Sequence, residues 1–239
     1  MRVPKLILIM LTFAVSEPSA GMEISRQRAC SGGDILRLRG SIERGDYLKF
    51  RSHFSDERRV VGLNLDSGGG SLDEGIRIAA LTRQKRLSTF VSKECHSACA
   101  FIFFLGAKRY IGKDAKIGVH SVSNDYGSED NGAIRDTIYF ARLSAKLGIP
   151  SSTIGKMVAT PPGRITFLDQ ADLLALKVIV RDPFARKVSE TQSCSSARGS
   201  GEVSIKKDTP DRYATVSSRS VALERERKSL KFLQRRALR

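Results

Sequence analysis

Apolar residues recur along the chain with two different spacings, which predict alternating strands and helices. Alternation with polar residues, or a short apolar run, is typical of β-strands and occurs in residues 35–40, 60–65, 88–91, 117–120 and 178–180. Apolar residues three or four positions apart, or a longer apolar run, are typical of helices and occur in residues 44–55, 72–83, 98–105, 131–147 and 168–176. Strands that alternate with helices favour a largely parallel sheet with crossover helices. We therefore predict one α/β domain over residues 22–184.

The helix predicted over residues 131–147 carries an apolar stripe made of Ile134, Ile138, Ala141 and Ala145. Gly148 and Pro150 follow it closely and predict the end of the helix.

The first twenty residues have the pattern of a secretory signal peptide. A short basic start precedes the apolar run 6–15, and small or turn-prone residues follow. The apolar run is well short of the ~20 residues that a membrane-spanning helix needs. We therefore expect residues 1–20 to be a signal peptide and the protein to be exported, to the bacterial periplasm or out of the cell. An uncleaved N-terminal membrane anchor is the alternative.

Residues 185–239 differ in composition from the predicted domain. They begin rich in Ser, Gly and Thr, which is typical of a linker. Residues 198–239 then hold twelve Lys and Arg against five Asp and Glu, and residues 220–239 can form a basic amphipathic helix. We expect this tail either to contact an anionic membrane surface or to be an extension without function.

The whole chain is strongly basic, with 41 Lys and Arg against 25 Asp and Glu and a formal net charge of +16. A charge of this size suggests nucleic-acid binding as a first interpretation. The predicted signal peptide and the lack of any recognisable nucleic-acid reading module disfavour it, and the absence of Trp leaves few stacking surfaces. We expect no nucleic-acid partner.

Three short segments contain residues with chemical potential. Residues 66–71 form a glycine-rich turn between a predicted strand and a helix, where backbone N–H groups can bind an anion or an oxyanion. Their spacing matches neither the P-loop nor the dinucleotide-binding fingerprint. Ser97 opens an apolar helix, where a plain N-cap is the alternative role. His120 ends a short strand, and a serine and a histidine can form a nucleophile–base pair.

Four ordered motifs, in residues 66–71, 95–100, 106–110 and 117–120, resemble those of the ClpP/crotonase superfamily. The chain is most similar to exported ClpP-like bacterial relatives of the Clp peptidase subunit, and the resemblance covers residues 35–180. It implies a spiral of ββα units with an outlying helix that mediates assembly. The helix predicted over residues 131–147 matches that outlying helix, so a homo-oligomer is expected.

The resemblance also implies roles for individual residues. Ser97 matches the family's nucleophile and His120 its general base. Gly70 and Ala98 match the residues whose backbone N–H groups form the oxyanion hole. These roles agree with the chemistry that an activated serine needs, namely a base within reach and donors for the developing oxyanion.

The chain departs from the family pattern where the third member of the catalytic triad is expected. The family places an Asp just before a Phe-Leu pair; Phe167 and Leu168 are present here, but no carboxylate precedes them. Asp169 is the nearest acid, so it is our candidate for the third member. A Ser–Lys dyad would require Lys146, which is poorly placed for that role. Gly68 also stands where the family usually has Pro.

Four cysteines offer two candidate disulfides. Cys95 and Cys99 flank the serine and could brace its turn in an oxidising compartment, and Cys30 could pair with Cys194. Four independent thiols are the alternative. Cys95, His96 and Cys99 are conceivable metal ligands, but the sequence offers no second pair of ligands to complete a site, so we expect neither a metal nor a cofactor.

These observations favour an exported serine hydrolase that acts as an ATP-independent peptidase on unfolded or short peptides. The rival hypothesis is a catalytically weak or inactive ClpP-like protein that binds partners or serves as an oligomeric scaffold. The missing carboxylate supports this rival, because loss of the orienting Asp costs a serine protease about 10⁴ in turnover. A crotonase-type enzyme of acyl-CoA chemistry is compatible with the fold alone, although it needs no Ser–His pair.

Overall fold

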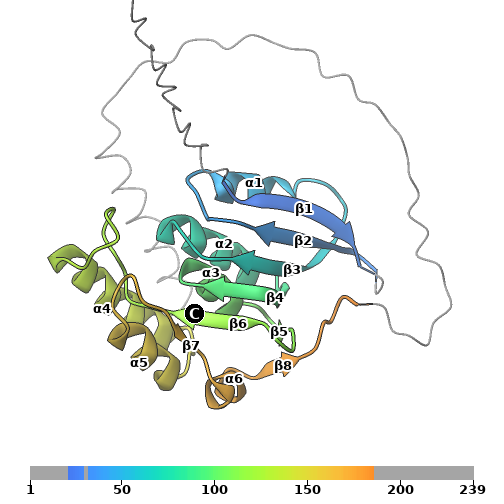
Figure 1. Cartoon of the computed structure of the whole chain (residues 1–239). Coiled ribbons are helices and arrows are strands. Elements are labelled where there is room, and N and C mark those ends of the chain that lie inside the picture. Colours follow the sequence, from blue (N-terminus) through green and yellow to red (C-terminus); the bar gives the residue numbers. More distant parts are fainter. Residues whose placement is uncertain (1–20, 30–31, 186–239) are drawn as a thin grey trace, which may run out of the picture.

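The computed structural model of the chain describes residues 21–29 and 32–185 (Figure 1). The predicted signal peptide, almost all of the predicted tail, Cys30 and Cys194 lie outside the described residues. Within the described ranges, no helix combines the length and the apolar character needed to cross a membrane.

Within the described residues, eight strands form one mixed sheet with the order β1-β2-β3-β4-β5-β8, in which β6 pairs with β4, and β7 pairs with β6 (Figure 1). The strands are β1 (Glu23–Arg28), β2 (Asp34–Arg39), β3 (Val60–Ser67), β4 (Ser88–His96), β5 (Arg109–Ile111), β6 (Lys116–Val119), β7 (Thr166–Phe167) and β8 (Val178–Val180). The β1–β2 and β6–β7 pairs are antiparallel, and the other pairs are parallel. The largely parallel sheet predicted from the sequence is therefore confirmed.

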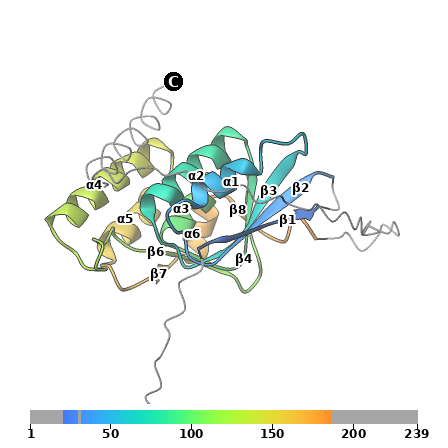
Figure 2. The same cartoon turned by 90° about the horizontal axis from the view of Figure 1, so that it is seen from above.

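Helices lie beside this sheet in two groups. They are α1 (Asp46–Ser52), α2 (Leu72–Gln84), α3 (Ala98–Phe104), α4 (Asn131–Lys146), α5 (Ser151–Ala159) and α6 (Gln170–Ala175). Helices α1, α2 and α3 cover one face of the sheet, whereas α4 and α5 form a pair that projects from its side (Figures 1 and 2). This mixed α/β arrangement, with an outlying helix, is the one expected for a ClpP/crotonase-like fold.

The core lies between the sheet and α3. Alternate residues of the central strands, such as Leu36, Leu38, Leu63 and Leu65, are fully buried. Every residue of α3 is buried as well, which explains why this helix is apolar on all sides. Because α3 is enclosed by the core, the residues at its N-terminus have a fixed position.

Helix α4 does not bury the stripe predicted for it. Ile134 and Ile138 are 44% and 45% exposed. The buried residues are instead Ala133, Thr137, Phe140, Leu143 and Ser144. Phe140 packs against Phe101 of α3 with ring centroids 4.6 Å apart and ring planes tilted by 60°, and this contact lies on the buried face of α4.

Candidate active site

Ser97 occupies a sharp turn between the end of β4 and the start of α3. Its backbone has φ 54° and ψ −124°, a positive φ that few non-glycine residues adopt and that costs of order 1–3 kcal/mol. The Ser97 N–H donates to the carbonyl of Gly118 at 3.1 Å, which ties the turn to β6. The Ser97 side chain makes no capping hydrogen bond to α3. The hydroxyl is therefore not used as a helix cap.

A disulfide encloses this turn. Cys95 and Cys99 are joined by an S–S bond, with their Cα atoms 5.2 Å apart. Both residues are 0% exposed. The bond links the end of β4 to the first turn of α3, and Ser97 lies between the two cysteines in the sequence. For this pair, the structure has the disulfide rather than two independent thiols.

The glycine-rich loop after β3 packs directly against the serine turn. A Cβ atom on Gly69 would lie 2.7 Å from the Cβ of Ser97 and 3.2 Å from the backbone nitrogen of Ala98. Gly69 also has φ +96°, which favours glycine. No side chain fits between the loop and the turn, so the loop backbone reaches the serine.

The two segments that meet at Ser97 each carry a backbone N–H group with the features of an oxyanion donor. An isolated parallel bridge joins Ile42 to Gly70. In this bridge the Ile42 N–H donates to the Gly69 carbonyl at 2.7 Å, and the Ser71 N–H donates to the Ile42 carbonyl at 2.8 Å. In a parallel bridge this pattern directs the Gly70 N–H away from Ile42. The Ala98 N–H lies at the first position of α3, where no intrahelical acceptor exists. Such a pair of donors can stabilise an oxyanion.

His120 follows β6 directly and is half-buried. Its Nδ1 lies 2.6 Å from the carbonyl oxygen of Ser121. Gly118 of β6 lies opposite His96 of β4, and its carbonyl accepts the hydrogen bond from the Ser97 N–H. His120 is two residues beyond Gly118 in the chain. Within the described chain, no hydrogen bond joins the Ser97 hydroxyl to the His120 ring. Such bonds are often long in free enzymes and shorten when substrate binds.

A second histidine, which the sequence analysis did not assign to catalysis, lies next to the serine. His96 is 8% exposed, and its ring packs over Gly118 and meets the Phe167 ring at a centroid distance of 5.3 Å. Its Nε2 is 3.3 Å from a carboxylate oxygen of Glu94, without hydrogen-bond geometry. Burial lowers the pKa of His96 below its usual value, and His120 lowers it further, against the opposing effect of Glu94. The His96 ring therefore favours its neutral form.

The structure gives Asp169 a different role from the one expected. Its carboxylate caps α6 by accepting from the Asp172 N–H at 3.0 Å and pairs with the Lys156 ammonium at 2.7 Å. The hydrogen bond from Lys156 is the main reason that the pKa of Asp169 falls to about 2. Within the described chain, Asp169 makes no hydrogen bond to His120. The structure therefore gives no support for Asp169 as the third triad member. Lys146, which a Ser–Lys dyad would require, is exposed at the end of α4.

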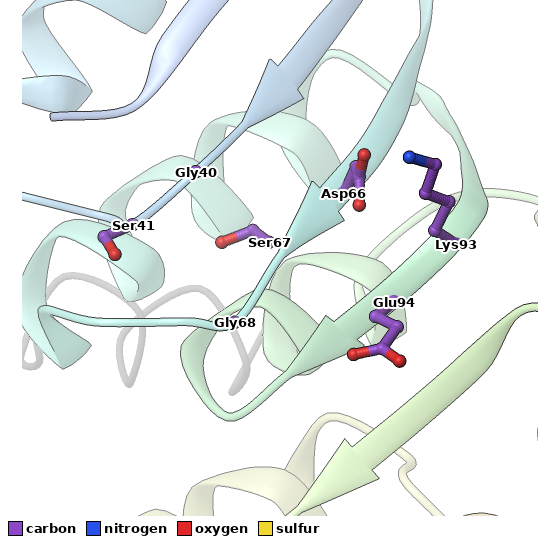
Figure 3. Close-up of a pocket in the computed structure, with 7 residues that line it drawn as sticks. All are labelled: Gly40, Ser41, Asp66, Ser67, Gly68, Lys93 and Glu94. Atoms are coloured by element: carbon purple, nitrogen blue, oxygen red, sulfur yellow. The ribbon is translucent and has the colours of Figure 1, made fainter. Parts of the chain in front are cut away.

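A polar pocket adjoins the glycine-rich loop (Figure 3). Its volume is ≈ 330 Å³, and it is lined by Gly40, Ser41, Asp66, Ser67, Gly68, Lys93 and Glu94. It lies where β2, β3 and β4 end, and Gly68 immediately precedes the glycine that contacts Ser97. The lining carries both signs of charge and fits a polar part of a ligand. Among the residues that the structure describes, no group of three His, Cys, Asp or Glu could hold a metal ion.

Comparison with known proteins identifies no matching family model and no matching curated protein. Among solved structures, the chain is similar to a mutant of the 1510-N membrane-bound stomatin-specific protease, with 18% sequence identity and a TM-score of 0.46. The match covers 62% of this chain and 78% of that chain. We base the functional proposal on the geometry of this chain.

Proposed function

We propose that the protein is a ClpP-like serine hydrolase with peptidase activity, in which Ser97 is the nucleophile and His120 the general base. The carrying observation is the Ser97 turn. Its hydroxyl does not cap α3, its backbone is held at a positive φ, and the glycine-rich loop approaches it so closely that a Cβ atom on Gly69 would lie 2.7 Å from the Ser97 Cβ. A helix cap with no other task needs neither the strained backbone nor the close approach of Gly69.

The mechanism follows from these positions. Ser97 Oγ attacks the substrate carbonyl while His120 Nε2 takes the hydroxyl proton. The negative charge that develops on the carbonyl oxygen is stabilised by the N–H groups of Gly70 and Ala98. His120 then gives the proton to the leaving amine, and an acyl-enzyme forms on Ser97. Water, activated by His120, hydrolyses the acyl-enzyme and restores the serine.

We also propose that the protein acts outside the cytoplasm, without ATP, on unfolded or short peptides. The Cys95–Cys99 disulfide supports this location, because thiols in the cytosol are normally kept reduced. The exposed apolar residues Ile134 and Ile138 on the outlying helix support a homo-oligomer. Contact of the basic tail with anionic lipid remains part of the proposal and concerns residues outside the described ranges.

One observation favours a second candidate, a ClpP-like scaffold or binding protein with little activity. The described chain has neither a Ser97–His120 hydrogen bond nor a carboxylate bonded to His120. A serine in such a site would react slowly with substrates.

Covalent labelling with a fluorophosphonate probe distinguishes the two candidates. We expect the purified full-length protein to be labelled, and Ser97→Ala and His120→Ala to abolish labelling. Ser71→Ala is the matched control, because Ser71 is a nearby serine that caps α2. Equal labelling of wild type and Ser97→Ala, or none of either, would rule out Ser97 as nucleophile and favour the scaffold.

A further inference from the structure

The only hydrogen bond of the His120 ring within the described chain is to a backbone carbonyl. His120 Nδ1 and the Ser121 oxygen are 2.6 Å apart. Because a carbonyl can only accept, Nδ1 must carry the proton, which leaves the lone pair of the neutral ring on Nε2. This is the tautomer that a general base toward Ser97 requires, and the one that the triad Asp stabilises in serine proteases.

Hydrogen bonds hold the peptide group that carries this carbonyl and also the peptide group before it. The Ser121 N–H donates to the carbonyl of Thr160, at the end of α5, at 2.8 Å. The Val122 N–H, in the same planar peptide group as the Ser121 carbonyl, donates to Thr137 Oγ1 at 2.9 Å. Thr137 is 5% exposed on α4 and fixed by packing. A donor bond at the nitrogen fixes the peptide plane and strengthens the carbonyl as an acceptor.

Three carboxylates that could have replaced the triad Asp have other partners. Glu94 lies against His96, Asp130 accepts from the Ala133 N–H and the Asn124 amide, and Asp169 pairs with Lys156. None of them is hydrogen-bonded to His120 in the part of the chain that the structure describes. The orientation of His120 therefore has a main-chain source.

We propose that the Ser121 carbonyl takes the place of the triad carboxylate, and that Thr137 is the positioning residue that holds this carbonyl toward His120. The inference rests on the proposed function, since it assigns the group that orients the proposed base. This arrangement connects the outlying helix α4 to the proposed base His120 through one peptide group. Helix α4 itself contributes no group that reacts.

Substitutions of Thr137 test the proposal through the rate of fluorophosphonate labelling of the full-length protein. Thr137→Val keeps the shape but removes the acceptor, and we expect labelling to slow about tenfold, the effect of losing roughly one hydrogen bond from the orienting group. Thr137→Ser keeps the hydroxyl and should label within about twofold of wild type. Thr82→Val is the matched control, since Thr82 is a buried helical threonine whose hydroxyl bonds Ile78 in the remote helix α2.

Asp169→Asn tests the competing assignment. It keeps a residue that can cap α6, and we expect it to label at the wild-type rate. A loss approaching 10⁴-fold, as for a triad Asp, would overturn the proposal, as would unchanged labelling of Thr137→Val.

Nitrogen-15 NMR of the histidine ring supplies a readout that does not depend on activity. The chain has 3 His, so the His120 signals are assigned by their loss in His120→Ala. We expect the Nδ1–H tautomer in wild type and a mixture of tautomers in Thr137→Val. A wild-type His120 with its proton on Nε2 would overturn the inference. If wild type has the Nδ1–H tautomer but is not labelled, the proposed function fails while the positioning by Ser121 and Thr137 stands.

Discussion

Reduction of the Cys95–Cys99 disulfide is the perturbation with the clearest expected consequences. The two cysteines are four positions apart. For so short a loop, the chain-entropy model gives a loss of about 2 kcal/mol in the free energy of unfolding at 25 °C. For a domain of this size, that loss corresponds to a fall of about 4–8 °C in Tm.

The same bond should affect the serine. Ser97 is held at φ 54°, a conformation that costs of order 1–3 kcal/mol and persists only under external constraint. The disulfide is one such constraint, because it joins the residues on both sides of the turn. Once the bond is broken, we expect the turn to relax in part and fluorophosphonate labelling of Ser97 to slow about tenfold, equivalent to roughly 1.4 kcal/mol.

The assay uses a Cys30→Ser/Cys194→Ser background, so that Cys95 and Cys99 are the only cysteines of the chain. Thermal unfolding and labelling rates are measured before and after treatment with a phosphine reductant. Alkylation and mass measurement establish that reduction is complete, which is needed because both cysteines are buried. A Cys95→Ala/Cys99→Ala variant on this background should not respond to reductant. Complete reduction with unchanged Tm and unchanged labelling would refute the bracing role.

Three further predictions concern single side chains. Gly70→Ala should reduce the rate of fluorophosphonate labelling at least about 100-fold. It should also lower the free energy of unfolding by about 1–3 kcal/mol, because the new Cβ would lie 2.3 Å from the Ile42 carbonyl oxygen and Gly70 has φ +134°. Labelling at the wild-type rate would argue against an oxyanion donor at this position. The lowered pKa of buried His96 means that the unfolded chain binds the proton more tightly, so stability falls as pH decreases from about 6.5. His96→Gln should remove part of this dependence, and so should His53→Gln, because burial also lowers the pKa of His53; chemical denaturation at pH 7 and 5 measures both. Asp169, with its pKa lowered to about 2, should stabilise the fold above pH 4 and lose this contribution as pH falls toward 2. Acid unfolding of Asp169→Asn should lack this part, and an unaltered acid profile would contradict the Lys156 pairing.

Much of the central architecture was determined by local sequence. The strands β2 and β3 and the helices α2 and α3 were predicted within a few residues, because each has a strong period or a continuous apolar run. The order of the short motifs also indicated which residues to examine around Ser97. These features are set by residues that are neighbours in the chain.

Other features depended on contacts between distant segments. Strands β1, β5 and β7 and helix α5 were not predicted, since each is short or weakly patterned and owes its form to its neighbours in space. On α4, both faces carry apolar residues, and the buried face is the one on which Phe140 packs against Phe101. Sequence spacing alone could not distinguish the two faces.

The candidate site shows the same division. The sequence by itself determined the identity of the serine, the histidine and the glycine-rich turn. Only the tertiary structure decided what orients them. Asp169 was our candidate because it is the acid nearest in the chain to the expected position, but its carboxylate caps α6 and pairs with Lys156 of α5. His120 instead meets the Ser121 carbonyl, held by Thr137. Every residue carries a backbone carbonyl, so no side-chain pattern can identify the one whose direction the fold fixes.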